Sequence, residues 1–115
     1  MYKKLKVYQR SYKMAISIYK FAETMPKDER YGLTSQIKRA VTSIPLNIAE
    51  GYGKGDTEAE QKRYLKMAKG SCNEMEVLLD LCKDLGFMKE DAHQKYVNEI
   101  QEIGAMLYGL IKSLN

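Results

Sequence analysis

One stretch decides the fold: Leu33-Thr-Ser-Gln-Ile-Lys-Arg-Ala-Val-Thr-Ser-Ile-Pro-Leu-Asn-Ile-Ala-Glu-Gly51. Its apolar residues recur at steps of three and four, which keeps them on one helix face, and no segment of the chain alternates with the period of a half-buried strand. Pro45 removes one backbone hydrogen bond, so we expect it to kink the helix or to split it near Val41 and Thr42. The apolar face comprises Leu33, Ile37, Ala40, Val41, Ile44 and Ile48.

Turn-forming residues divide the rest of the chain into segments that share this helical period. The breaks fall at residues 25–28, at residues 51–57 and at Gly86. The predicted helices cover residues 6–25, 30–51, 57–85 and 89–114. Because the connections are short, we predict an all-α fold, in which a single domain over residues 1–115 forms an antiparallel up-down-up-down four-helix bundle.

Two positions support the boundaries of the third predicted helix. Asp56 or Thr57 can accept a backbone N–H at its start, where Glu58 and Glu60 suit the positive end of the helix dipole. Gly86 fits the left-handed backbone position just past its end. Both features are typical of a helix that begins near residue 57 and ends near residue 85.

The overall composition excludes some classes of protein. At 44% hydrophobic and 30% charged, the 115-residue chain is typical of a soluble helix-rich domain. No apolar run approaches the roughly 18 residues of a membrane span, and the basic first residues lead into no apolar signal segment. We therefore expect a cytoplasmic protein without a membrane partner.

The net charge of +4 is unevenly divided along the chain. Residues 1–70 carry 15 basic and 7 acidic side chains, whereas residues 71–115 carry 4 basic and 8 acidic ones. The two parts therefore have net charges of +8 and −4. Such asymmetry indicates either a polyanion-binding face or merely crowded surface charge, and the count alone favours the second interpretation.

Residues suited to catalysis or metal binding are scarce. Cys72 and Cys82 lie about 15 Å apart along one predicted helix at 1.5 Å per residue, too far for a disulfide within that helix, so we interpret them as core residues. His93 has no second histidine or cysteine nearby and is interpreted as a solvated surface residue. We expect no metal, no cofactor and no catalytic residue, and therefore no enzyme.

Polar residues form a second file beside the apolar face of the stretch quoted above, and the third predicted helix holds a matching set. We interpret them as a structural network between helices or between subunits, with Arg39 paired to Glu50 or Glu74, because buried charges persist when paired. A ligand or catalytic pocket is the alternative, and Gly70 suggests a close backbone approach. The network residues are Gln36, Arg39, Ser43, Asn47, Glu50, Arg63, Ser71 and Glu74.

Basic residues also form files at helical spacing, and these are our candidate nucleic-acid-binding residues. Lysines and arginines spaced by one helical turn can follow phosphates, and tyrosines such as Tyr2 and Tyr12 can add stacking. A solvated face that keeps the bundle soluble is an equally good interpretation of such stripes. The first file is Lys6, Arg10, Lys13 and Lys20, and the second is Lys62, Lys66 and Lys69.

Two shorter stretches flank residues 33–51: Lys6-Val-Tyr-Gln-Arg-Ser11 before them and Arg63-Tyr-Leu-Lys-Met-Ala-Lys-Gly-Ser71 after them. With these motifs, the chain closely resembles the bacterial four-helix-bundle family named after proteins encoded in intervening sequences of 23S rRNA genes. The resemblance extends over about residues 5–114, and its most specific part is S-I-P-x-N-I-A-E-G at residues 43–51. The departures are mild: Tyr8 stands where tryptophan is common, and Cys72 where leucine or another apolar residue is more usual.

The resemblance implies a ring-like homopentamer of antiparallel four-helix bundles. It also implies kinship with the accessory protein of diversity-generating retroelements, a basic pentamer that binds nucleic acid and a reverse transcriptase. It supplies no catalytic residues.

Our leading hypothesis is therefore a non-enzymatic, oligomeric nucleic-acid-binding protein with a preference for structured RNA. The alternative is an assembly or adaptor ring that engages another protein and whose basic surface is incidental. An enzyme would require an additional pocket around Arg39, Asn47, Glu50 and Glu74.

Overall fold

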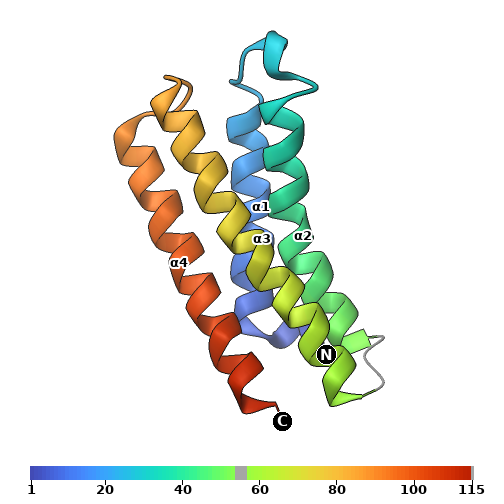
Figure 1. Ribbon diagram of the computed structural model, residues 1–115. Coiled ribbons are helices and arrows are strands. Elements are labelled where there is room, and N and C mark those ends of the chain that lie inside the picture. Colours follow the sequence, from blue (N-terminus) through green and yellow to red (C-terminus); the bar gives the residue numbers. More distant parts are fainter. Residues whose placement is uncertain (54–56, 115) are drawn as a thin grey trace.

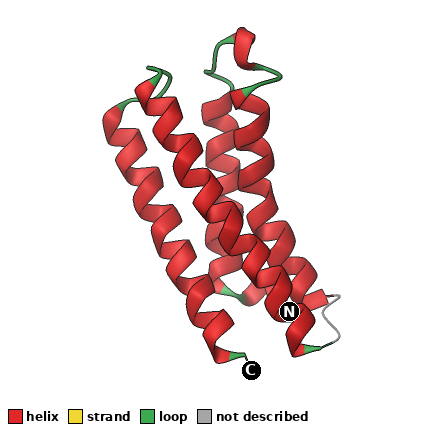
Figure 2. Cartoon of the chain, viewed as in Figure 1, coloured by secondary structure: helices red, strands yellow, loops and turns green. Residues whose placement is uncertain are grey.

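The structure, a computed structural model, describes residues 1–53 and 57–114, and this part contains four long helices and no strand (Figure 2). The expected all-α bundle is thus confirmed. Two short 3-10 helices, η1 and η2, precede the first and second long helices. The elements are η1 (Tyr2–Lys4), α1 (Lys6–Ala22), η2 (Lys27–Glu29), α2 (Leu33–Gly53), α3 (Glu58–Asp84) and α4 (Glu90–Ser113).

The helices pack side by side into an elongated bundle of 43 × 24 × 21 Å. Each long helix contacts the next one along the chain, and α1 also contacts α4. Both chain ends lie at the same end of the bundle (Figure 1). α4 is therefore flanked by α1 on one side and by α3 on the other. This order determines which charged side chains of α1 and α3 lie beside α4.

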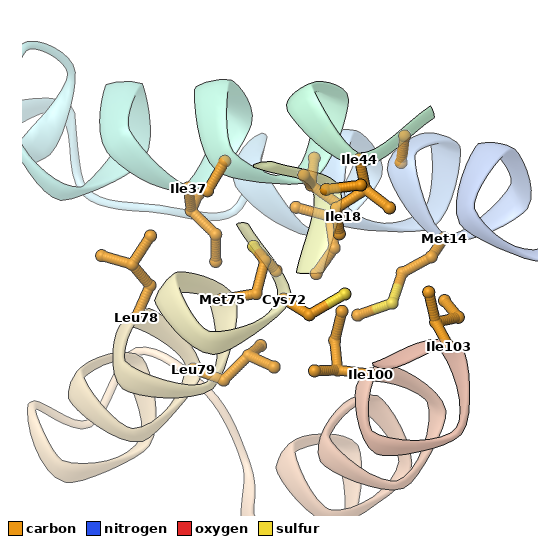
Figure 3. Packing of buried hydrophobic residues seen from close by; sticks show 14 of the residues in the cluster. Met14, Ile18, Ile37, Ile44, Cys72, Met75, Leu78, Leu79, Ile100 and Ile103 are labelled. Atoms are coloured by element: carbon orange, nitrogen blue, oxygen red, sulfur yellow. The ribbon is translucent and has the colours of Figure 1, made fainter. Parts of the chain in front are cut away.

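The core lies on the bundle axis and receives side chains from all four helices (Figure 3). Ile18, Ile44, Met75, Leu79 and Ile103 are fully buried there. Burying a side chain of this size stabilises the fold by roughly 1.5–3 kcal/mol relative to exposure. Every residue predicted for the apolar face of the second helix is buried, because its steps of three and four match the helical period.

α2 continues without interruption through Pro45, so the split expected near Val41 does not occur. Pro45 is itself buried, and Val41, Ile44 and Ile48 on both sides of it are fully buried. The packing of this face outweighs the single backbone hydrogen bond that proline removes.

The ends of the helices are fixed by local contacts. Thr57 Oγ1 accepts a 3.1 Å hydrogen bond from Glu60 N at the start of α3, whereas Asp56 lies outside the described residues. Gly86 has a φ of 85°, the left-handed position expected after α3. Between α1 and α2 the structure differs from the prediction: α1 ends at Ala22 and α2 begins at Leu33, where Glu29 Oε1 accepts a hydrogen bond from Leu33 N.

Candidate nucleic-acid interface

The basic file of α1 borders α4, and its members differ in how free their charges are. Lys6, Lys13 and Lys20 are exposed. Arg10 instead donates from Nε to Glu99 Oε2 at 2.9 Å and from Nη2 to Glu99 Oε1 at 2.8 Å, and it also pairs with Glu102. These hydrogen bonds raise the pKa of Arg10, and those to Glu99 have the largest effect. The charge of Arg10 is thus already balanced, and its contacts fasten α1 to α4.

The basic file of α3 borders the other side of α4. Lys66 is exposed, and Lys62 and Lys69 are half-buried. The stem of Lys69 lies against α4, with its Cε 3.7 Å from the position that a Cβ on Gly104 would take. The file therefore lies along the junction of α3 and α4.

Two residues of α4 extend this file, and neither was among the binding residues predicted from the sequence. Tyr108 is 57% exposed, and Lys112 Nζ lies 5.7 Å from the centre of its ring. The spacing of four between Tyr108 and Lys112 was the signal that could have identified them. We call the combined surface the lysine–tyrosine face; it comprises Lys62, Lys66, Lys69, Tyr108 and Lys112.

Three residues of the predicted polar network, Ser43, Asn47 and Ser71, form hydrogen bonds with one another. Ser71 Oγ, on α3, donates to Ser43 Oγ on α2 at 2.8 Å. Asn47 Nδ2 donates to both the carbonyl and the hydroxyl oxygen of Ser43 at 2.9 Å. These short side chains join α2 to α3 at the place where the two helices meet.

The outer members of the network lie apart. Gln36, Arg39 and Glu74 are exposed, and within the described residues Arg39 forms no ion pair, so its expected pairing with a glutamate is not observed. Arg63 contacts residues of its own helix, with Nη2 3.9 Å from Glu60 Oε2.

A stripe of mostly apolar residues, with Glu74 at its centre, runs along the exposed side of α3. Val77 is 59% exposed, and Met67 and Leu81 are also exposed. Gly70 leaves open space, since no atom lies within 4 Å of where its Cβ would be. The stripe repeats at steps of three and four, like a helix-packing face. We call it the α3 seam; it comprises Met67, Gly70, Glu74, Val77 and Leu81.

A second apolar feature lies between α1 and α2. It is a groove with a volume of about 420 Å³. Tyr8 packs between Tyr2 and Tyr12, with ring centres 5.0 and 5.9 Å apart. Leu46 on its rim is 62% exposed. We call this the tyrosine groove; its walls include Tyr2, Tyr8, Tyr12, Ile16, Tyr19, Pro45 and Leu46.

The cysteines and the histidine have structural positions. Cys72 and Cys82 are free and buried, and burial raises their pKa values to about 12 and about 11. His93 is not the solvated residue expected from the sequence. Its side chain is only 12% exposed, and Nε2 lies 2.7 Å from Asp80 Oδ1, which joins α4 to α3.

Metal-binding clusters and membrane spans are both missing from the described residues. No group of three or more histidine, cysteine, aspartate or glutamate side chains among them could hold a metal ion. None of the helices in this part of the chain combines the length and the apolar character needed to cross a membrane.

The fold and these surfaces define a class of small helical-bundle proteins with a basic face and two exposed apolar features. The chain belongs to the 23S rRNA-intervening sequence protein family, whose model matches residues 3–109. A similar solved structure is a protein with unknown function from the S23 ribosomal protein family of Bacteroides thetaiotaomicron. It is 25% identical, with a TM-score of 0.85 over 92% of this chain and 95% of that chain. No curated protein matches the chain significantly.

Proposed function

We propose that the chain is the subunit of a homo-oligomeric, non-enzymatic protein that binds nucleic acid in the cytoplasm, with structured RNA as its preferred ligand. The observation that carries this proposal is the lysine–tyrosine face. In the described part of the chain, none of its four lysines forms an ion pair with a carboxylate. Free cations at one-turn spacing are suited to consecutive phosphates. Lys6, Lys13 and Lys20 add further positive charge beyond α4.

Self-assembly is the second part of the proposal. The tyrosine groove and the α3 seam, which is apolar except for Glu74, are different surfaces, so the seam of one copy can pack into the groove of the next. Such a heterologous contact closes into a ring when the rotation between copies allows it. We propose a homopentamer of antiparallel up-down-up-down bundles, the state that the family resemblance implies. A ring repeats the basic face and raises the affinity for a long polyanion through multivalency.

Light scattering after size-exclusion chromatography tests the assembly. The expected mass is about five times that of the 13.2 kDa chain. A monomer at micromolar concentration would refute the ring.

Nucleic-acid binding is tested by fluorescence anisotropy with an RNA hairpin and a DNA duplex at several salt concentrations. If six to ten phosphates are contacted, the affinity should fall by about 10³–10⁵ between 50 and 200 mM salt. The hairpin is expected to bind more tightly than the DNA duplex. Absence of binding to both at low salt would overturn the proposal.

The tyrosine groove supports a second candidate function, an adaptor that engages another protein. The two candidates assign different occupants to the groove, a second copy or a foreign partner. Replacing the rim residue by Leu46→Glu separates them. Loss of the oligomer supports the ring, whereas an intact oligomer that no longer retains a protein partner after nuclease treatment supports the adaptor.

A further inference from the structure

The junction of α3 and α4 has features that phosphate binding alone does not require. A cavity with a volume of about 360 Å³ lies between the two helices. Tyr108 and Lys69 stand on its walls, together with the amide side chains of Asn73 and Gln101 and the carboxylate of Glu76. The cavity thus adjoins the lysine–tyrosine face and adds polar groups to it.

The order of the side chains along the junction is informative. On α3, Lys62, Lys66 and Lys69 are followed after four residues by Asn73, on the same helix face. On α4, Gln101 precedes Tyr108 by two helical turns, on a face that borders the same cavity. Cations therefore occupy one end of the junction, an aromatic ring lies among them, and two amides and one carboxylate line the cavity beyond it.

The surface also carries acidic side chains, and one of them stands on the cavity wall. Glu58 precedes the three lysines on α3, whereas Glu76 follows them and lines the cavity. Lys69 Nζ has only a weak contact, 3.5 Å from Asn73 Oδ1. Arg10, by contrast, is balanced by two carboxylates of α4. Each of the two basic files thus keeps three lysines without an ion pair among the described residues, and the file on α3 is the one that adjoins this cavity.

An exposed ring at the position of Tyr108 is suited to unpaired bases more than to a duplex. Its ring is more than half exposed and has Lys112 Nζ 5.7 Å from its centre. An exposed aromatic ring among lysines is the arrangement on which proteins stack unpaired bases. The bases of an intact duplex are already stacked on each other and leave no face open to such a ring. Amide side chains such as those of Asn73 and Gln101 can donate to and accept from the edges of an unpaired base.

We infer that the α3–α4 junction binds unpaired nucleotides, such as those in the loops and bulges of a structured RNA. Tyr108 stacks on a base, Lys66, Lys69 and Lys112 contact the flanking phosphates, and the cavity accepts the base edge. The inference rests on the proposed nucleic-acid binding and names the site and the ligand class. The centre of the α3 seam lies about 90° around the helix from the centre of the lysine file at 100° per residue. Lys66 borders the seam, whereas Lys69 lies on the side of α4, away from it.

The test compares a single-stranded oligouridine with a blunt RNA duplex of equal phosphate count, both fluorescently labelled and titrated at low salt. Wild type is expected to bind the single strand more tightly. Tyr108→Leu should weaken the binding of the single strand by about 5- to 100-fold and leave the duplex affinity unchanged. Tyr108→Phe should retain wild-type binding, because the stacking ring is kept.

Two further variants complete the design. Lys66→Gln should weaken both ligands and lower the slope of log affinity against log salt by about 1. Tyr31→Leu is the matched control, since Tyr31 is exposed and lies beside Arg30 but belongs to the connection between α1 and α2. It should bind both ligands like wild type.

The possible failures are distinguishable. If wild type binds neither ligand, the proposed nucleic-acid function fails. If it binds both and Tyr108→Leu changes neither affinity, the function stands and the assignment of this junction is overturned. A duplex bound more tightly than the single strand also overturns the assignment. Unchanged circular dichroism spectra and melting temperatures exclude misfolding as the cause of any loss.

Discussion

Thr34 places a hydroxyl group in the first turn of α2 where it is buried without a partner among the described residues. A buried hydroxyl that gains no hydrogen bond retains its full cost of desolvation. Thr34→Val keeps the shape and removes that cost, so we expect it to stabilise the protein by about 1 kcal/mol, measured as the free energy of unfolding in urea.

The matched control is Thr42→Val on the same helix. Thr42 Oγ1 donates to Lys38 O at 2.9 Å, so its replacement removes a hydrogen bond that exists. It should be neutral or destabilising by less than about 1 kcal/mol. A Thr34→Val protein less stable than wild type would show that its hydroxyl has a partner.

The buried thiols predict a loss of stability in alkaline solution. Burial raises the pKa of Cys72 to about 12, whereas the thiol of an unfolded chain has a pKa of about 8.5. The free energy of unfolding thus has its full value below pH 8.5. It falls as the pH rises towards 12, because in this range only the unfolded chain releases the proton of the thiol. Between pH 8.5 and 10.5, wild type should lose about 2 kcal/mol more than Cys72→Ala, measured by urea unfolding. Equal losses would contradict the burial of the thiol.

Replacing glycine by alanine should have opposite effects on stability at two positions, because the backbone conformations there differ. Gly86 follows α3 with a φ of 85°, which L-residues rarely adopt, whereas Gly109 lies inside α4. Neither has an atom within 4 Å of the position that an added Cβ would take, so the backbone alone sets the effect. Gly86→Ala should destabilise by about 1–2 kcal/mol, and Gly109→Ala should stabilise by up to about 1 kcal/mol. Thermal unfolding measures both, and shifts of the same sign would contradict the assigned conformations.

At the scale of elements, the features that could be predicted from the sequence are those that depend on one helix alone. The apolar faces of α2 and α3 and the position of Gly86 follow from spacing and from backbone chemistry. The partners of Arg10 could not be predicted, because they depend on the register of α4 against α1, which packing of the whole core sets. Tyr108 could have been identified from its spacing of four to Lys112, but the sequence alone did not show that this pair lies beside the lysine file of α3.

At the scale of the molecule, charge and apolar surface occupy different sides of α3. The lysine file faces the junction with α4, and the α3 seam lies about 90° away around the helix. A ring held together through the seam would keep every lysine–tyrosine face accessible. Assembly and nucleic-acid binding are thus separable, and a variant can remove one without the other.

Gly70 allows that separation to be tested. It lies in the α3 seam, and open space surrounds it in the isolated subunit, so a larger side chain creates no clash within one chain. Gly70→Leu should therefore fold normally, since leucine also favours a helix more than glycine does, but the added bulk should prevent a second copy from packing there. We expect light scattering to give the mass of the 13.2 kDa monomer for this variant. Gly109→Leu, at an equally open position on α4, should remain oligomeric like wild type, and an intact oligomer of Gly70→Leu would exclude the seam as the contact between subunits.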